Sequence, residues 1–177
     1  MHKKNLSINI HNEYLHFSAA HFTIFSATDR ERLHGHNFAV KAVATSQIQA
    51  DGLAFDYNEL KRELASICDS LDEYTLIAEN SKHLTIREKS NYYSVLFNDQ
   101  EMLLLQCDTL LLPVANITLE ELGNYIIEQL RLSGLFERVC IENLEVDVSS
   151  GSGQSVTSFY SKGKGKGKGE GKGNSNE

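Results

Sequence analysis

Two capped helical segments divide a chain whose other parts have the composition of β-strands. The segments span residues 56–71 and 118–133, and each starts with a side chain that can cap a helix, followed three residues later by glutamate. Each then carries apolar residues at helical spacing. Strand-like sequence occupies residues 6–25, 37–46 and 143–160. This order predicts an α+β fold in which two helices lie on one face of an antiparallel sheet.

The length and composition predict one folded domain followed by a tail. A chain of 177 residues with 41% hydrophobic content is long enough for one core and short for two. We expect a single domain over residues 1–161, in which residues 79–112 form inserted short strands. Residues 162–177 alternate lysine with glycine and have no apolar side chain, so we expect a disordered tail. A contact of these lysines with RNA or a membrane surface is the less favoured alternative.

Charge and hydropathy exclude several classes of partner. Without the tail the chain has 12 basic and 22 acidic side chains, a net charge of −10, which argues against nucleic-acid binding. No apolar run reaches the roughly 20 residues that cross a bilayer, and the first residues lack the apolar stretch of a signal peptide. We therefore expect a cytoplasmic protein that contacts neither nucleic acid nor membrane.

Histidines near the starts and ends of strands suggest a metal centre. His34 and His36 occur as His-x-His at the start of a strand, so both side chains point to the same face. His21 ends the preceding strand, which a hairpin-like return would bring alongside. Three neutral imidazoles with an open fourth position form the usual catalytic site for Zn²⁺. The remaining histidines are interpreted as ordinary surface or core residues: His2, His11, His16 and His83.

The motifs "FSAAHF" and "LHGHNF" together resemble the 6-pyruvoyl-tetrahydropterin synthase and 6-carboxy-tetrahydropterin synthase family. The similarity continues through "DGLAFDYNELK", "LDEYTL" and "NITLEEL", and covers about residues 6 to 160. The resemblance implies a T-fold whose sheets join into a β-barrel on oligomerisation, most simply as a hexamer made of two trimers. It also implies a catalytic zinc ion held by His21, His34 and His36.

The same resemblance suggests which residues move protons. Glu31 gives the spelling Glu-x-x-His-Gly-His, which resembles a branch of the family in which glutamate replaces the catalytic cysteine. A carboxylate beside zinc can act as general base, and the alternative is a surface carboxylate paired with Arg30 or Arg32. In "LDEYTL" the family's relay aspartate is kept as Asp72, while Glu73 stands where the family has histidine.

One further departure concerns substrate binding. The glutamate that anchors the pterin ring in the family falls on Val148 in "LEVDVSSGSGQSV", with Asp147 one residue away on the opposite face of the strand. A valine cannot hydrogen-bond the ring. Either the extra residues around Ser149 to Gly153 shift the register and put a carboxylate elsewhere, or the substrate is not an ordinary pterin.

Two functions follow from these observations. The preferred one is a zinc-dependent lyase that acts on the side chain of dihydroneopterin triphosphate or a related pterin, for folate or queuosine biosynthesis. Its product would be a 6-hydroxymethyl-, 6-pyruvoyl- or 6-carboxy-pterin, and its catalytic residues Glu31, Asp72 and Glu73. The alternative is a zinc-binding T-fold module that has lost or altered catalysis and binds a different small molecule.

Overall fold

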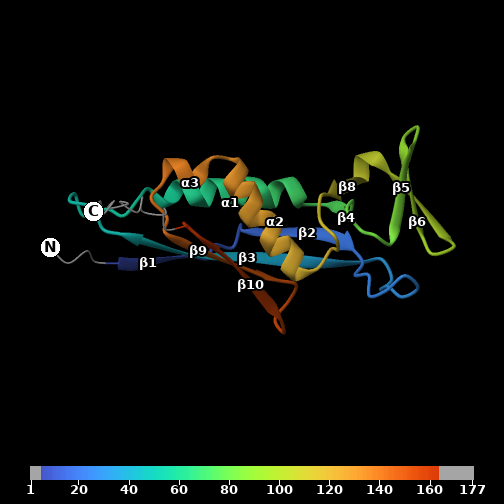
Figure 1. Ribbon diagram of the computed structural model, residues 1–177, viewed down its shortest axis with the longest axis horizontal. Coiled ribbons are helices and arrows are strands. Elements are labelled where there is room, and N and C mark those ends of the chain that lie inside the picture. The colour runs from blue at the N-terminus through green and yellow to red at the C-terminus, as the bar shows by residue number, and fades with distance from the viewer. Residues whose placement is uncertain (1–4, 164–177) are drawn as a thin grey trace, which may run out of the picture.

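The computed structural model describes residues 5–163, which form a large sheet, a helical layer on one of its faces and a small second sheet (Figure 1). The helices are α1 (Tyr57–Leu71), α2 (Leu119–Leu132) and α3 (Leu135–Arg138), with a 3-10 turn, η1 (Gln106–Asp108). The strands are β1 (Asn5–Ile10), β2 (His16–His21), β3 (His34–Gln47), β4 (Tyr74–Ala78), β5 (Leu84–Lys89), β6 (Tyr92–Phe97), β7 (Gln100–Leu105), β8 (Thr109–Leu112), β9 (Asn143–Ser149) and β10 (Ser155–Ser161).

The long strand β3 organises the large sheet. Within residues 5–163 this sheet has seven strands in the order β10-β9-β3-β2-β4-β8, and β1 pairs with the second half of β3. The pairings among β1, β2, β3, β9 and β10 are antiparallel, as expected. Strands β10 and β8 end the described sheet, which does not close on itself.

The expectation of a wholly antiparallel sheet is wrong at one side, because β4 runs parallel to β2 and β8 runs parallel to β4. Parallel neighbours need a long connection between them. Strand β3 and helix α1 connect β2 to β4, and the inserted strands β5, β6 and β7 connect β4 to β8. The seven-stranded sheet is therefore mixed.

The two long helices pack as their apolar stripes predict. Their buried residues meet the inward face of β3 in one core that includes Leu60, Leu64, Leu122, Ile126, Phe38 and Val40. At the N-terminus of α2, the Thr118 hydroxyl accepts a hydrogen bond from the Glu121 amide at 3.4 Å. Helix α2 ends at Leu132 with Ser133 as its C-cap, and Gly134 has a φ of 74°, the left-handed conformation that glycine adopts most easily.

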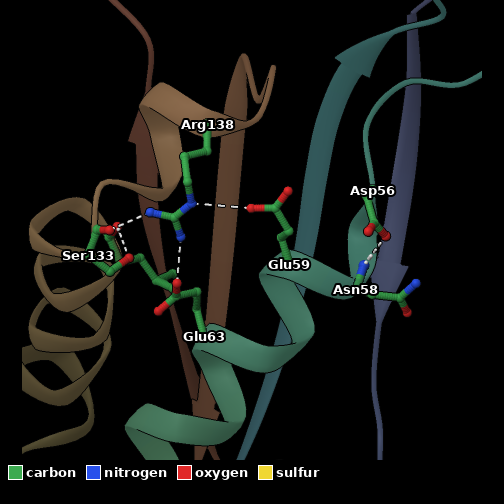
Figure 2. Close-up of polar contacts among 7 residues, drawn as sticks. Asp56, Asn58, Glu59, Glu63, Ser133 and Arg138 are labelled. Atoms are coloured by element: carbon green, nitrogen blue, oxygen red, sulfur yellow. Dashed lines mark hydrogen bonds and ion pairs between the residues drawn. The ribbon is translucent and has the colours of Figure 1, made fainter.

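Helix α1 is capped by a local hydrogen bond and held to α3 by ion pairs. The Asp56 side chain caps α1 by accepting from the Asn58 amide at 2.9 Å (Figure 2). Glu59, three residues after this cap, makes no reciprocal capping bond; its carboxylate instead pairs with the Arg138 guanidinium at 3.2 Å. Arg138 also contacts Glu63, so it links α3 to two successive turns of α1.

The inserted strands form a separate three-stranded antiparallel sheet, β5-β6-β7, at one end of the molecule (Figure 1). Its tight turns pass through Ser90 and Asn98, both with positive φ. One face of this sheet packs on a second apolar cluster that includes Phe22 and Ile24 from the chain after β2. The insertion therefore contacts the segment that leads from β2 to β3.

Two expectations fall at the ends of the chain. Of the Lys/Gly tail, residues 164–177 lie outside the described part, as does His2. None of the helices formed by residues 5–163 is both long and apolar enough to pass through a lipid bilayer.

Candidate metal centre

Three histidine side chains meet where β2 ends and β3 begins. His21 is the last residue of β2 and is paired directly with His34, the first residue of β3, while His36 lies two residues further along. Opposed residues of an antiparallel pair, and residues two apart on one strand, point to the same face. One ligand atom from each of the three residues lies within 4.8 Å of the others.

Main-chain carbonyls orient two of the three rings. His21 Nδ1 lies 3.0 Å from the Ile117 carbonyl oxygen, and His34 Nδ1 lies 2.7 Å from that of Arg32. Each Nδ1 therefore donates, which leaves the lone pair of each ring on Nε2. Such a hydrogen bond behind the ring is the usual arrangement of a metal-binding histidine.

The donor atoms fit a metal ion. His21 Nε2 is buried and has no hydrogen-bond partner among the described residues. The Nε2 atoms of His34 and His36 lie 3.0 Å apart. Because His34 Nδ1 donates to Arg32, His34 Nε2 carries no proton and its lone pair points toward His36. Convergent imidazole lone pairs with a buried unpartnered nitrogen suit Zn²⁺, which binds three histidines and keeps one position open in catalytic sites.

The surroundings keep His21 in the form that binds metal. Burial lowers the pKa of His21 below its usual 6.5, and the neighbouring His34 and His36 lower it further. The hydrogen bond to Ile117 and the charge of Glu31 oppose this change without reversing it. A buried imidazole with a low pKa stays neutral near pH 7, as a metal ligand must.

This pKa shift makes the metal-free fold sensitive to acid. Below about pH 6.5 the unfolded chain binds a proton at His21 that the folded chain does not, so the free energy of unfolding falls as the pH falls. The slope contributed by one group is at most about 1.4 kcal/mol per pH unit. Urea unfolding of chelator-treated protein between about pH 7.5 and 5.5 should show this loss, and His21→Asn should reduce it. An unchanged slope in that variant would contradict the assignment, and His11→Asn, at an exposed position, is the control.

Glu31 lies beside the three histidines. Its carboxylate accepts a hydrogen bond from the Thr23 amide at 3.0 Å, and its own amide donates to the Thr23 carbonyl at 2.9 Å. Burial raises the pKa of the Glu31 carboxyl, but hydrogen bonds from Thr23 and the charges of His34 and His21 outweigh that effect and lower it overall. Glu31 is thus an ionised carboxylate held in place by the turn that carries it.

The surface ion pairs considered for Glu31 are not formed. Among the described residues Glu31 makes no ion pair with Arg30 or Arg32. The Arg30 guanidinium instead lies over the Phe22 ring, 4.9 Å from its centroid. Glu31 lines the pocket that contains the histidines, whereas Arg30 does not.

That pocket has a volume of about 350 Å³, and its far wall comes from distant parts of the chain. The N-terminus of α2 contributes its cap Thr118 and Glu120, while the β9–β10 hairpin contributes Ser150, Gln154 and Ser155. Glu120 was not predicted as a site residue, although it lies in the "NITLEEL" segment. Nothing in the sequence predicted the hairpin residues as part of the site, apart from their place in a polar turn.

A family model described as 6-pyruvoyl tetrahydropterin synthase matches residues 10–158. The chain belongs to this family. A Methanocaldococcus jannaschii protein, provisionally named as a 6-carboxy-5,6,7,8-tetrahydropterin synthase, is 28% identical over 155 residues, covering 84% of this chain and 92% of that protein. The fold and family expected from the sequence are therefore confirmed.

Solved structures of 6-pyruvoyl tetrahydropterin synthases share the T-fold. The Plasmodium vivax enzyme is 28% identical with a TM-score of 0.79, covering 89% of this chain and 99% of that one. The Plasmodium falciparum enzyme is 26% identical with a TM-score of 0.81, covering 89% and 98%. Two further structures of the P. vivax enzyme are described as catalytic residue mutants in which a glutamate is replaced by alanine or cysteine.

Within this tetrahydropterin synthase fold, Asp72 and Glu73 lie apart from the histidine pocket. The Asp72 carboxylate accepts a hydrogen bond from the Ser18 amide at 2.6 Å, so it stabilises the junction of α1 and β4 with β2. Glu73 is exposed, has a φ of 64° and lines a separate hollow of about 700 Å³. The two hollows share His36 and Ser150. One chain thus does not bring Asp72 or Glu73 into the pocket of Glu31.

Val148 is fully buried in the main core of this family member, and Asp147 points to the opposite face. Residues 150–154 connect β9 to β10, and this connection places Ser150 and Gln154 on the pocket wall. The hairpin therefore offers hydroxyl and amide groups to a ligand, whereas neither of its carboxylates, Glu145 and Asp147, lines this pocket. Asp147 lines a different hollow.

Proposed function

We propose that this chain is a zinc-dependent lyase that acts on the side chain of dihydroneopterin triphosphate or a related pterin. The observation that carries the proposal is the convergence of three histidines and one oriented carboxylate in a single pocket. Membership of the 6-pyruvoyl tetrahydropterin synthase family supports the substrate class. The product would be a 6-hydroxymethyl-, 6-pyruvoyl- or 6-carboxy-pterin.

His21, His34 and His36 would hold the zinc ion. When bound, zinc supplies a Lewis acid that polarises an oxygen of the substrate side chain. The hydrogen bonds to Ile117 and Arg32 fix two of the rings before any ion binds. The site is therefore preorganised by the main chain, which reduces the cost of assembling it.

Glu31 would act as the general base. Its ionised carboxylate can accept a proton from the carbon or hydroxyl of the side chain that is being cleaved. Thr23 fixes the direction of this carboxylate by bonding it on one side. The catalytic glutamate named for the P. vivax enzyme supports this assignment, since the two chains are 27% identical.

Asp72 and Glu73 remain candidates for a proton relay only if a second chain contributes them. We propose that copies of this chain join at the open edges β8 and β10 into a barrel, with a hexamer as the most symmetric product. Unpaired edges favour such pairing unless they are covered. The hollow that contains Glu73 opens beside His36, so a neighbouring subunit would lie close to the metal centre.

Glu120 is the proposed anchor for the pterin ring. A pterin presents adjacent N–H donors on its pyrimidine edge, and a carboxylate accepts two such bonds at once. Glu120→Gln should raise KM about 10- to 100-fold, with a smaller change in kcat, because a charged hydrogen bond is lost from binding. Steady-state kinetics check this prediction. Glu121→Gln, one residue along and off the pocket wall, is the matched control, and equal effects of both variants would contradict it.

The alternative is a zinc-binding T-fold module with altered or lost catalysis. Val148, buried in the core where the family has its anchoring glutamate, favours this alternative. Incubating zinc-loaded protein with dihydroneopterin triphosphate and identifying products by mass distinguishes the two functions. A shortened pterin side chain supports the lyase. Unchanged substrate supports the altered module.

A further inference from the structure

The turn that carries Glu31 has an unusual support. This turn, residues 22–33, joins β2 to β3, and it will be called the Glu31 turn. Its Arg30 side chain lies over two aromatic rings, with Cζ 4.9 Å from the centroid of Phe22 and 5.4 Å from that of Phe97. The space beside these two rings that Arg30 occupies will be called the Arg30 slot. The Arg30 Nη1 donates to the main-chain carbonyl of Glu31 at 2.7 Å.

One side of this slot belongs to the inserted sheet. Phe97 is the last residue of β6, whereas Phe22 directly follows β2, and both rings are only 3% exposed in the second apolar cluster. The insertion thus supplies a wall that the Glu31 turn could not build from its own residues. Arg30 is the contact that joins this wall to the carbonyl of Glu31.

The Arg30 guanidinium is held by rings and a carbonyl, with no carboxylate in reach. Among residues 5–163 it forms no ion pair, and its Nε is buried without a hydrogen-bond partner. A flat guanidinium can stack on aromatic faces while its edge donates a hydrogen bond, which a lysine ammonium cannot do in the same place. The slot is therefore specific for arginine.

The main chain of the Glu31 turn is itself paired: Ile24 lies opposite Arg30 in an antiparallel bridge, and the Phe25 and Ser26 amides donate to the Asp29 carbonyl at 2.9 and 3.1 Å. The Asn116 side chain bonds both the amide and the carbonyl of Ile24, at 3.0 and 2.8 Å. The Glu31 amide also donates to the Thr23 carbonyl at 2.9 Å, so these main-chain bonds hold the turn as a hairpin. Between Ile24 and Glu31, the side chain of Arg30 provides the contact with the second apolar cluster.

We infer that Arg30 is a positioning residue for Glu31, and that Phe97 makes the inserted sheet part of the support of the active site. The inference rests on the proposed function, since it assigns the purpose of the contact to proton transfer by Glu31. Small displacements of a reacting group can cost about 100-fold in rate. A residue that fixes the main chain of the base should therefore affect kcat more than KM.

The test compares Arg30→Met, Arg30→Lys and Phe97→Leu with Arg87→Met, an exposed position on the inserted sheet. We expect kcat with dihydroneopterin triphosphate to fall about 10- to 100-fold in Arg30→Met, with KM within about twofold and zinc content unchanged. Arg30→Lys should not restore kcat. Phe97→Leu should show a smaller loss of the same kind, and Arg87→Met none.

Amide hydrogen exchange of residues 22–33, measured without substrate, separates this inference from the proposed function. Exchange in this turn should rise about tenfold or more in Arg30→Met and Phe97→Leu, with the exchange of α2 unchanged. If wild-type protein turns over no pterin, the proposed function fails. The exchange result still decides whether Arg30 and Phe97 hold the Glu31 turn in place. Exchange within about twofold of wild type in both variants would overturn this inference, as would full rescue by Arg30→Lys. If Arg30→Met does not fold, Phe97→Leu decides.

Discussion

Replacing Glu31 with glutamine should lower kcat by about 10²- to 10⁴-fold, the usual cost of removing a general base. The amide keeps the size of the carboxylate and can still accept the hydrogen bond from Thr23, so the turn should keep its conformation. It cannot accept a proton at neutral pH. Zinc content and Tm should stay near wild type, because a change at a partly exposed position usually alters stability by less than about 0.5 kcal/mol.

The matched control is Glu88→Gln, an exposed glutamate on β5 that should keep wild-type kcat. If Glu31→Gln retains turnover, the base lies elsewhere, and Asp72 and Glu73 become the candidates. Asp72→Asn and Glu73→Gln then distinguish them. The first preserves an acceptor for the Ser18 amide, so a loss of kcat in that variant would reflect chemistry more than folding.

The convergence of the histidines could be predicted from the sequence because it depends on local rules. The spacing of His34 and His36 on one strand fixes their common face, and a return between adjacent strands brings His21 opposite. Whether they bind zinc stays a prediction. The helix caps at Asp56 and Thr118 are equally local, and the structure contains both.

Features that depend on distant contacts could not be predicted. The apolar runs of β4 and β8 indicate burial and say nothing about strand direction, which the long connections decide. Glu59 makes no reciprocal capping bond, and its carboxylate instead pairs with Arg138, which only the tertiary fold brings close. The direction of Arg30, away from the pocket, depends on Phe97 in the inserted sheet.

Removing one metal ligand should have the largest effect of any single substitution on metal content. His34→Ala should reduce bound zinc from about one ion per chain to less than about a tenth under conditions that saturate wild type, because only two imidazoles remain. Elemental analysis after dialysis measures this directly. Turnover should fall about 10³-fold or more, since the polarising charge is lost.

The fold should survive this loss, because His34 is only partly buried and its main chain keeps its pairing with His21. His36→Ala should give the same result, and His83→Ala, away from the pocket, should keep full zinc. Full zinc occupancy in His34→Ala would refute the assignment of the centre. Because metal content is measured without any substrate, this experiment tests the centre even if the ligand is no pterin. Zinc retained by wild type and lost by both variants, together with an absence of pterin turnover, would then favour the altered module.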